Sequence, residues 1–382
     1  MKKLCFVTTV SLTVRAFLLP VLEYYTTHTD WELTVICDDD PELASILPKG
    51  VNYIPVSMKR GISLGGIGAM LKLRKIFRKE KFDLVQFSTP NASLYASLAA
   101  KMAKIPVRLY CQWGIAYVGF GGMKRKIFKA VEKFVCRCAT QVEPDSFGNL
   151  KFSHAEGLYT PDKSRVIWNG SASGVSLTKF DIAHKDRWRQ EIRSRYGIGE
   201  DAFVYGFVGR ITRDKGINEL FTAYQKLCDR KINTYLMMVG RPENEELLDQ
   251  ALYNWAKEDP RVIFCGQTSE VEKFMSAMDV YILPSYREGF GSAVVEAEAM
   301  GVPVIVSDIP GPTDAMVPEK TGLVVKKADV DTLHQAMLRI LEDGALCVSL
   351  GQQASCFARE GFEQQELARR IVEDRKELMK IS

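Results

Sequence analysis

The chain has 382 residues, of which 46% are hydrophobic and 26% charged, a composition that excludes a disordered or fibrous protein and favours two globular domains. Its hydrophobic residues occur in short runs, none of which approaches the roughly 18 residues that a membrane-spanning helix needs. Residues 1–170 carry 24 Lys and Arg against 14 Asp and Glu, whereas residues 171–382 carry 27 against 33, so the basic character belongs to the first half.

Short apolar runs alternate with helical patterns from the amino terminus, which predicts parallel α/β layers. In the first half, strands are predicted at 4–10, 33–37, 52–56, 84–87, 107–111, 141–142 and 165–168, with helices at 15–27, 68–79, 94–103 and 124–138. The start, MKKLCFVTTV, is interpreted as a buried first strand, because it lacks the long apolar region and cleavage site of a signal peptide. The polar, irregular segment 171–187 is interpreted as a linker.

The second half repeats the alternation of strands and helices. Strands are predicted at 203–208, 234–239, 262–265, 280–283, 304–306 and 322–324, and an amphipathic helix at 364–380. The nine cysteines are scattered without paired CxxC spacing, which is typical of reduced thiols in a cytosolic protein and not of a zinc site.

Two segments of the first half concentrate positive charge. Residues 58–81 hold eight Lys and Arg, and a second cluster lies at 124–129. In the first segment Leu71, Leu73, Ile76 and Phe77 are interleaved with the cations. Such a helix suits an anionic membrane surface, and the absence of any nucleic-acid-binding pattern argues against nucleic acid as a partner. We therefore expect peripheral attachment to the inner face of the cell membrane, with a merely solvated helix face as the alternative.

The stretch 285–311, SYREGFGSAVVEAEAMGVPVIVSDIPG, is the most informative part of the chain. Gly289 and Gly291 free the loop that follows a predicted strand to approach a ligand closely. Ser292 is the predicted N-cap of a helix that runs to about residue 300, where Gly301 stops it. The unpaired N–H groups at the start of a helix suit a phosphate.

Two glutamates flank this predicted phosphate site. Glu288 lies in the loop and Glu296 lies one turn into the helix, whereas Glu298 is turned to another side of the same helix. Carboxylates in these two places can hold hydroxyl groups on either side of a diphosphate. A nucleotide sugar has that arrangement of sugar, diphosphate and ribose.

A second cationic motif follows the predicted strand 203–208. Arg210 and Lys215 come after Gly209, which places them at the carboxyl end of the sheet, where ligands of α/β proteins bind. An Arg can grip a phosphate through two hydrogen bonds and a Lys acts as a point charge. Taken alone, the pair is equally typical of a solvated loop.

The complete set of motifs resembles that of the retaining glycosyltransferases of family 4. The resemblance rests on Glu288 and Glu296 with EGFG between them, on the flanking PSYREGFG and AMGVPVIVSDIPG, and on GR…KG after the strand. It implies an α/β protein of the GT-B fold, with two Rossmann-like domains that face a cleft. These domains are expected at 1–170 and 188–362, joined by the linker 171–187, with a terminal helix at 363–382 that crosses back to the first domain.

The resemblance also implies a reaction and a set of site residues. The implied enzyme is metal-independent and transfers a hexosyl unit with retention from a nucleoside-diphosphate sugar, for which UDP is the expected nucleotide, in capsule, O-antigen or exopolysaccharide synthesis. The acceptor is expected to be a glycan or a polyprenyl-diphosphate-linked sugar, and no cofactor is expected. The implied catalytic residues are Arg210, Lys215 and Glu288, and the implied donor-binding residues are Gly209, Gly266, Val271, Gly289, Phe290, Gly291, Ser292 and Glu296. The nucleobase of the donor is expected beside residues 265–271.

The first half departs from the family in two places. Ser11, Thr13 and Arg15 stand where many relatives have a glycine-rich loop, and they can still meet a phosphate. Gln112 and Trp113 stand where many relatives have His-Gly, and they can shape the sugar pocket by hydrogen bonding and stacking, with a plain core tryptophan as the alternative. In the Asn-Gly turn at 169–170, Asn169 is expected to line the cleft.

Other interpretations remain open at this point. Residues 38–40 form an Asp-Asp-Asp run like the metal-binding motif of GT-A transferases, but a solvated turn is favoured because the donor motifs lie elsewhere. The glycines at 61–68 form no complete GxGxxG, so a nicotinamide site is not predicted. The alternative functions are a GT-B sugar-nucleotide epimerase and a non-catalytic member of a polysaccharide assembly complex.

Overall fold

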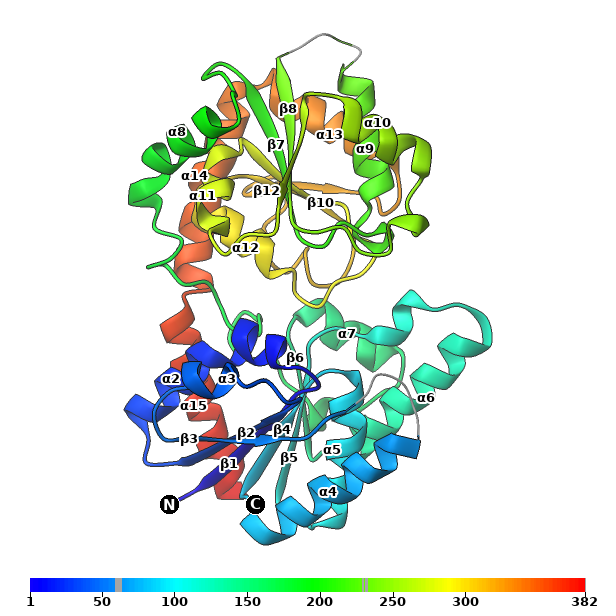
Figure 1. Ribbon diagram of the computed structural model, residues 1–382, viewed down its shortest axis with the longest axis vertical. Helices are drawn as coiled ribbons and strands as arrows, with labels where there is room; N and C mark the ends of the chain where they lie inside the picture. The colour runs from blue at the N-terminus through cyan, green and yellow to red at the C-terminus, as the bar shows by residue number, and fades with distance from the viewer. Residues whose placement is uncertain (59–63, 229, 231–232, 382) are drawn as a thin grey trace. The chain divides into compact units, whose positions relative to one another are not determined.

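The computed structural model describes residues 1–58, 64–228, 230 and 233–381, and it divides into two compact units that each contain one parallel sheet (Figure 1). Unit 1 comprises Met1–Gly174 together with Gln364–Ser382, and unit 2 comprises Val175–Glu363. Residues 59–63 of the basic segment 58–81, with their Lys, Arg and Gly, lie outside the described residues.

Unit 1 is built on a six-stranded sheet in the order β3-β2-β1-β4-β5-β6. Its strands are β1 (Lys3–Val7), β2 (Glu32–Cys37), β3 (Val51–Pro55), β4 (Leu84–Phe87), β5 (Val107–Gln112) and β6 (Gln141–Pro144). Its helices are α1 (Ser11–Thr13), the π-helical η1 (Val14–Leu18), α2 (Leu19–His28), α3 (Leu43–Ile46), α4 (Leu64–Glu80), α5 (Pro90–Met102), η2 (Ala116–Gly119), α6 (Gly122–Cys138), α7 (Phe147–Ala155), η3 (Pro161–Lys163) and α15 (Gln364–Ile381).

Helices cover both faces of the sheet in unit 1, and its central strand β1 presents apolar side chains to each face. Leu4 and Phe6 of β1 belong to the core that includes residues of α2 and α15, whereas Cys5 and Val7 belong to the core beneath α4 and α5. This alternation follows from the two-residue period of a strand. A strand buried on both faces reads as a continuous apolar run, and such a run predicted β1 from the sequence.

The terminal helix α15 is fixed to unit 1 by a buried arginine. Arg375 is 1% exposed and its guanidinium binds both carboxylate oxygens of Glu143, at the end of β6, at 2.5 and 3.0 Å. Asp374 lies 2.5 Å from the same guanidinium. The predicted return of the terminal helix to the first unit is therefore confirmed.

Unit 2 holds a second six-stranded parallel sheet, in the order β12-β11-β10-β7-β8-β9. Its strands are β7 (Phe203–Val208), β8 (Thr234–Val239), β9 (Val262–Gly266), β10 (Val280–Leu283), β11 (Val304–Ser307) and β12 (Gly322–Val325). Its helices are η4 (Ile182–His184), α8 (Lys185–Arg195), η5 (Arg213–Lys215), α9 (Ile217–Cys228), η6 (Glu245–Leu247), α10 (Gln250–Glu258), α11 (Val271–Ala277), α12 (Ser292–Ala299), α13 (Val330–Glu342) and α14 (Gly344–Gly361). One continuous hydrophobic core fills this unit.

The structure corrects several predicted elements. The strand prediction at 165–168 is wrong, because residues 165–167 are irregular and Trp168, with a φ of 51°, begins a turn. The first strand ends at Val7, and the chain enters α1 at Ser11. The segment predicted as an irregular linker contains η4, which Asp181 caps through its side chain, and the start of α8.

Two further sequence-based interpretations concern the chain as a whole. All nine cysteines are free thiols, most of them buried. Among the residues that the structure describes, no helix combines the length and the apolar character that crossing a bilayer requires.

Candidate active site

The predicted donor residues of unit 2 lie in loops that leave the carboxyl ends of neighbouring strands. The segment 209–215 follows β7, Gly266 ends β9, and Glu288 lies between β10 and α12. Since β10, β7, β8 and β9 are parallel neighbours, these ends share one edge of the sheet. Ligands of open α/β sheets bind at this edge.

Glycines allow the loops to pack against one another at this edge. A Cβ atom at Gly216, where φ is 72°, would lie 2.0 Å from the carbonyl oxygen of Pro284 at the end of β10. A Cβ atom at Gly311, where φ is 99°, would lie 1.9 Å from the carbonyl oxygen of Gly289. Only glycine fits at both places, so the loop around Gly289 is held in position by its neighbours.

Lys215 and Glu288 meet directly. The Nζ atom of Lys215 lies 2.5 Å from Oε1 of Glu288, and the two side chains are 17% and 12% exposed. The same two loops are joined again where the backbone N–H of Tyr286 donates to the carbonyl of Asp214 at 2.9 Å. The structure therefore brings together a cation and a carboxylate that lie 73 residues apart in the chain.

Arg210 forms its ion pair with a different carboxylate, that of Glu243. Its Nη1 atom binds Oε2 of Glu243 at 3.0 Å, and its side chain is 54% exposed. Arg241 binds the other oxygen of Glu243 at 2.9 Å, and the hydrogen bond from Arg210 is the main cause that holds the pKa of Glu243 below its usual range. In this structure Arg210 and Lys215 are thus held by two different carboxylates. Sequence reasoning missed Glu243, whose only signal is the acidic run that follows β8.

Helix α12 begins one residue earlier than its predicted cap implies. Gly291 is the N-cap, with φ at 87°, and Ser292 is the first helical residue. A positive φ favours glycine over serine, which explains the difference. The ring of Phe290 is 3% exposed and packs 5.3 Å from that of Phe362, so only the backbone of this predicted donor residue is left to face a ligand.

Glu296 lies half-buried on α12. Burial raises the pKa of its carboxyl to about 7, while Lys179 acts in the opposite direction and Glu272 adds to the increase. This carboxyl therefore titrates near neutral pH, and hydrogen bonds from hydroxyl groups would favour its ionised form. Glu298 is fully buried, which confirms that it points to another side of the helix.

The segment that is expected to contact the nucleobase follows β9. Gly266 is exposed and has a φ of 72°, and a Cβ atom there would meet nothing within 4 Å. Val271 is the first residue of α11 and packs partly against the core of unit 2. The open face of this loop therefore comes from its glycine and polar residues.

In unit 1, two of the residues after β1 are held by carboxylates. The backbone N–H of Ser11 donates to Asp38 at 2.6 Å, and Nη2 of Arg15 lies 2.9 Å from Asp40. Thr13 is partly exposed in α1. Two carboxylates of the Asp-Asp-Asp run thus fasten the turn after β1, and no group of three or more His, Cys, Asp or Glu suited to a metal ion occurs within the described part of the chain.

Gln112 differs from its predicted place in a sugar pocket. Its side chain is fully buried, its Nε2 donates to Glu132 at 2.6 Å, and its Oε1 accepts from Ser153 at 3.1 Å and Tyr159 at 2.9 Å. Both polar ends are used inside the unit. The neighbouring Trp113 is half-buried, with its ring 5.4 Å from that of Phe17.

The last predicted cleft residue, Asn169, is exposed on the turn before Gly170, whose φ is 97°. The backbone N–H of Gly170 closes this turn on the carbonyl of Ile167 at 2.9 Å.

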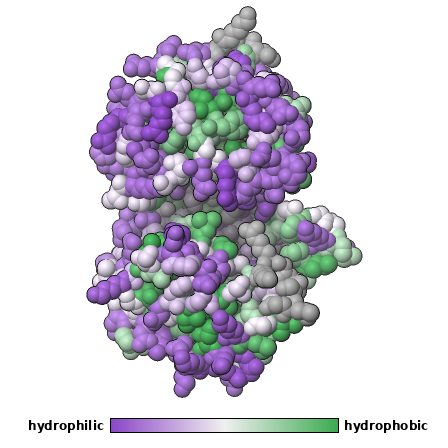
Figure 2. Space-filling model, viewed as in Figure 1, coloured by the Kyte–Doolittle hydropathy of each residue, from purple (hydrophilic) through white to green (hydrophobic). Residues whose placement is uncertain are grey.

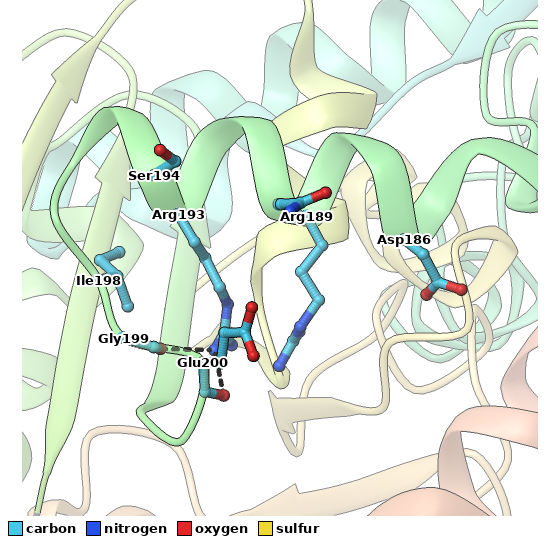
Figure 3. A pocket seen from close by; sticks show the side chains of 8 residues that line it. Asp186, Arg189, Arg193, Ser194, Ile198, Gly199 and Glu200 are labelled. Atoms are coloured by element: carbon cyan, nitrogen blue, oxygen red, sulfur yellow. Dashed lines mark hydrogen bonds between the residues drawn. The ribbon is translucent and has the colours of Figure 1, made fainter.

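A separate hollow of about 680 Å³ lies beside α8 and is not an anion site (Figure 3). Arg193 donates there to the carbonyls of Gly199 and Glu200, both at 3.4 Å, and it also binds Asp279 at 2.7 Å. Arg189 binds the same aspartate at 2.6 Å. These guanidinium groups are occupied within the unit, and none of the predicted donor residues lines the hollow.

Both units of the chain match families of known proteins. Residues 3–146 match the model of the family described as glycosyl transferase 4-like, and residues 189–356 match that of the glycosyl transferases group 1. A capsular polysaccharide biosynthesis glycosyltransferase, CapM of Staphylococcus aureus, is 30% identical over 322 residues, which cover 84% of this chain and 83% of CapM.

Two further proteins are similar over most or all of the chain. An Escherichia coli protein named UDP-Gal:alpha-D-GlcNAc-diphosphoundecaprenol alpha-1,3-galactosyltransferase is 27% identical and is matched over 84% of this chain and 82% of its own. The structure of sucrose-phosphate synthase from Thermosynechococcus elongatus superposes with a TM-score of 0.80 at 20% identity, with all of both chains covered, which shows a shared fold. The chain belongs to the group 1 glycosyltransferases, family 4, and has their GT-B fold, in which two Rossmann-like units each contain a sheet of parallel strands.

Proposed function

We propose that this glycosyltransferase moves a hexosyl unit from a UDP-linked sugar to a polyprenyl-diphosphate-linked glycan, with retention of configuration and without a metal ion, in the synthesis of a surface polysaccharide. The observation that carries the proposal is the contact of Lys215 with Glu288 at the carboxyl edge of the sheet, next to the start of α12. It places a cation for a diphosphate beside a carboxylate for sugar hydroxyls.

The chemistry rests on the charge of the leaving group. When the bond between the sugar C1 and the diphosphate oxygen breaks, the bonding electron pair stays on the diphosphate, and Lys215 and Arg210 neutralise the added charge. The acceptor hydroxyl oxygen bonds to C1 on the same face, and its proton passes to the departing phosphate oxygen. Lys215 exchanges Glu288 for phosphate when the donor binds, which releases Glu288 to accept hydrogen bonds from the sugar.

The rest of the donor is recognised by groups around this pair. The backbone N–H groups at the start of α12, from Ser292 onward, face the phosphates, since the first N–H groups of a helix lack partners within it. Glu296 accepts hydrogen bonds from the ribose hydroxyls. The loop that begins at Gly266 and ends at Val271 holds the nucleobase of the donor.

The acceptor is assigned to unit 1, whose excess of basic residues suits an anionic, lipid-linked substrate. Trp113, Asn169 and the residues after β1 are the proposed acceptor contacts, with Arg15 exchanging Asp40 for an acceptor phosphate. The names of these two relatives support this choice, because one names capsular polysaccharide biosynthesis and the other a diphosphoundecaprenol acceptor. The enzyme would then work at the inner face of the cell membrane.

The test is a transfer assay with a panel of UDP-hexoses and a polyprenyl-diphosphate-linked sugar in the presence of EDTA. We expect one UDP-sugar to yield a product whose new linkage has the anomeric configuration of the donor by NMR. Conversion of a nucleotide sugar without an acceptor would instead indicate an epimerase. Tight binding of nucleotide sugars with no turnover would indicate a non-catalytic protein.

A further inference from the structure

Helix α6 of unit 1 carries an apolar stripe on its outer side. Met123, Ile127 and Phe134 are 69%, 51% and 40% exposed, and Ala130 between them is exposed as well. Their spacing of four, three and four residues places all four on one face of a helix. In Figure 1, α6 lies at the outer edge of unit 1, and Figure 2 shows apolar atoms among polar ones over this projecting part.

A row of cations runs beside this stripe. Lys126, Lys133 and Arg137 follow one another at intervals of seven and four residues, so they lie along one side of the apolar face. Lys126 and Arg137 are exposed and Lys133 is partly exposed. Within the part of the chain that the structure describes, none of the three forms an ion pair.

The opposite side of α6 explains why the stripe faces outward. Glu132 accepts hydrogen bonds from Tyr110 at 2.8 Å and from Gln112 at 2.6 Å, both on β5. Lys129 pairs with Glu156 at 2.7 Å. These buried and half-buried contacts fix the rotation of the helix about its axis, so the outer stripe is a defined surface of unit 1.

Helix α4, the basic helix singled out from the sequence, differs from α6. Leu73 and Phe77 are fully buried in the core, and Ile76 packs against it. Of the four apolar residues interleaved with its cations, only Leu71 is exposed, at 48%. The apolar residues expected to meet a membrane here mostly face the sheet, which corrects the sequence-based interpretation of this helix.

We propose that α6 is the surface by which unit 1 binds an anionic phospholipid bilayer. The stripe would enter the boundary between headgroups and acyl chains, as amphipathic helices do, while the row of cations meets lipid phosphates. The uncompensated positive row beside a narrow apolar stripe favours an anionic bilayer over a protein partner. The inference rests on the proposed function only in that a polyprenyl-linked acceptor lies in such a membrane.

Vesicle sedimentation of the full-length protein tests the proposal. The vesicles contain 70% phosphatidylcholine and 30% phosphatidylglycerol, with pure phosphatidylcholine for comparison. Each basic residue near an anionic surface contributes about 1 kcal/mol, a factor of about five in partitioning, so Lys126→Glu with Arg137→Glu should lower binding at least about 25-fold. Ile127→Ser with Phe134→Ser should lower it about tenfold or more, because exposed apolar area no longer enters the interface.

The matched control reverses two exposed cations of α4. Lys75→Glu with Arg78→Glu changes the net charge by the same amount and should weaken binding far less. Equal losses in the α4 and α6 variants, or equal binding to both kinds of vesicle, would overturn the proposal. A serine variant that lost self-association instead of vesicle binding would also overturn it, in favour of a second copy of the chain.

A parallel measurement separates this proposal from the proposed function. UDP binding by calorimetry reports on unit 2 and should be unchanged in all the vesicle variants. Wild-type protein that transfers sugar but binds no anionic vesicles at low salt would refute the docking surface and leave the proposed function standing. Wild-type protein that binds vesicles through α6 but transfers no sugar would do the reverse.

Discussion

Replacement of Glu296 by Gln should stabilise the protein at pH 8 and leave its stability unchanged near pH 4. Burial raises the pKa of Glu296 to about 7, above the ordinary value for a glutamate of about 4.5. Between these two values the native state keeps a proton that the unfolded chain has lost. The free energy of unfolding of the wild type therefore falls as the pH rises through this window.

The size of the effect follows from the pKa difference. Each pKa unit corresponds to about 1.4 kcal/mol, so the full effect above pH 7 is about 3.5 kcal/mol at most. In a domain the size of unit 2, about 1 kcal/mol shifts the melting temperature by about 2–4 °C. The Gln variant should therefore melt up to about 14 °C above the wild type at pH 8.

Scanning calorimetry at pH 4 and pH 8 measures this difference, with Glu258→Gln as the control, since Glu258 is exposed at the end of α10. The control variant should differ from the wild type equally at both pH values. UDP should also bind the wild type more tightly at pH 8 than at pH 6, because the ribose hydroxyls that we assign to Glu296 would donate to its ionised form. A Glu296→Gln variant whose melting temperature differs from the wild type by the same amount at both pH values would refute this account of the site.

Four further outcomes are expected. Arg210→Ala should lower turnover by about 100-fold or more, because the diphosphate would lose its cationic partner. Glu243→Gln, which frees that arginine, should leave turnover unchanged. Equal losses in both variants would mean that the ion pair itself matters. Glu288→Ala should raise the KM for the sugar nucleotide while UDP binds with unchanged affinity, and calorimetry that shows a matching loss for UDP would contradict the sugar-binding role. Transfer should persist in EDTA, and a requirement for manganese or magnesium would contradict neutralisation by side chains. Gln112→Ala should cost about 2–4 kcal/mol in urea unfolding, because Glu132 loses a buried hydrogen bond, while a variant of wild-type stability with impaired transfer would return Gln112 to the sugar pocket.

The strands and the motif loops could be predicted because they depend on local signals. The short, largely apolar runs that form β4, β7, β8 and β10 were predicted with the observed bounds, since such runs are typical of parallel strands buried on both faces. The predicted cap of α12 was wrong by one residue, because glycine and serine are both common at that position and only the backbone angle distinguishes them.

Contacts between distant residues could not be read from the sequence. The partner of Arg210 lies 33 residues away on the loop after β8, and that of Gln112 lies 20 residues away on α6. The outward faces of α4 and α6 were equally hidden, because both helices mix apolar and basic residues. The packing of α4 against α5 decides that Phe77 is buried, and the contacts of α6 with β5 on its opposite side decide that Ile127 is exposed.

The most direct test of the central claim is the turnover of Lys215→Ala at saturating donor and acceptor, with UDP release as the readout. Lys215, which we assign to the diphosphate, lies in a partly buried place. Loss of its charge should therefore lower turnover by about 100- to 1,000-fold, as the loss of one preorganised charge-stabilising group does elsewhere. Circular dichroism and melting temperature establish that the variant is folded. A folded Lys215→Ala variant that releases UDP at close to the wild-type rate would contradict the assignment of the active site to this edge of unit 2.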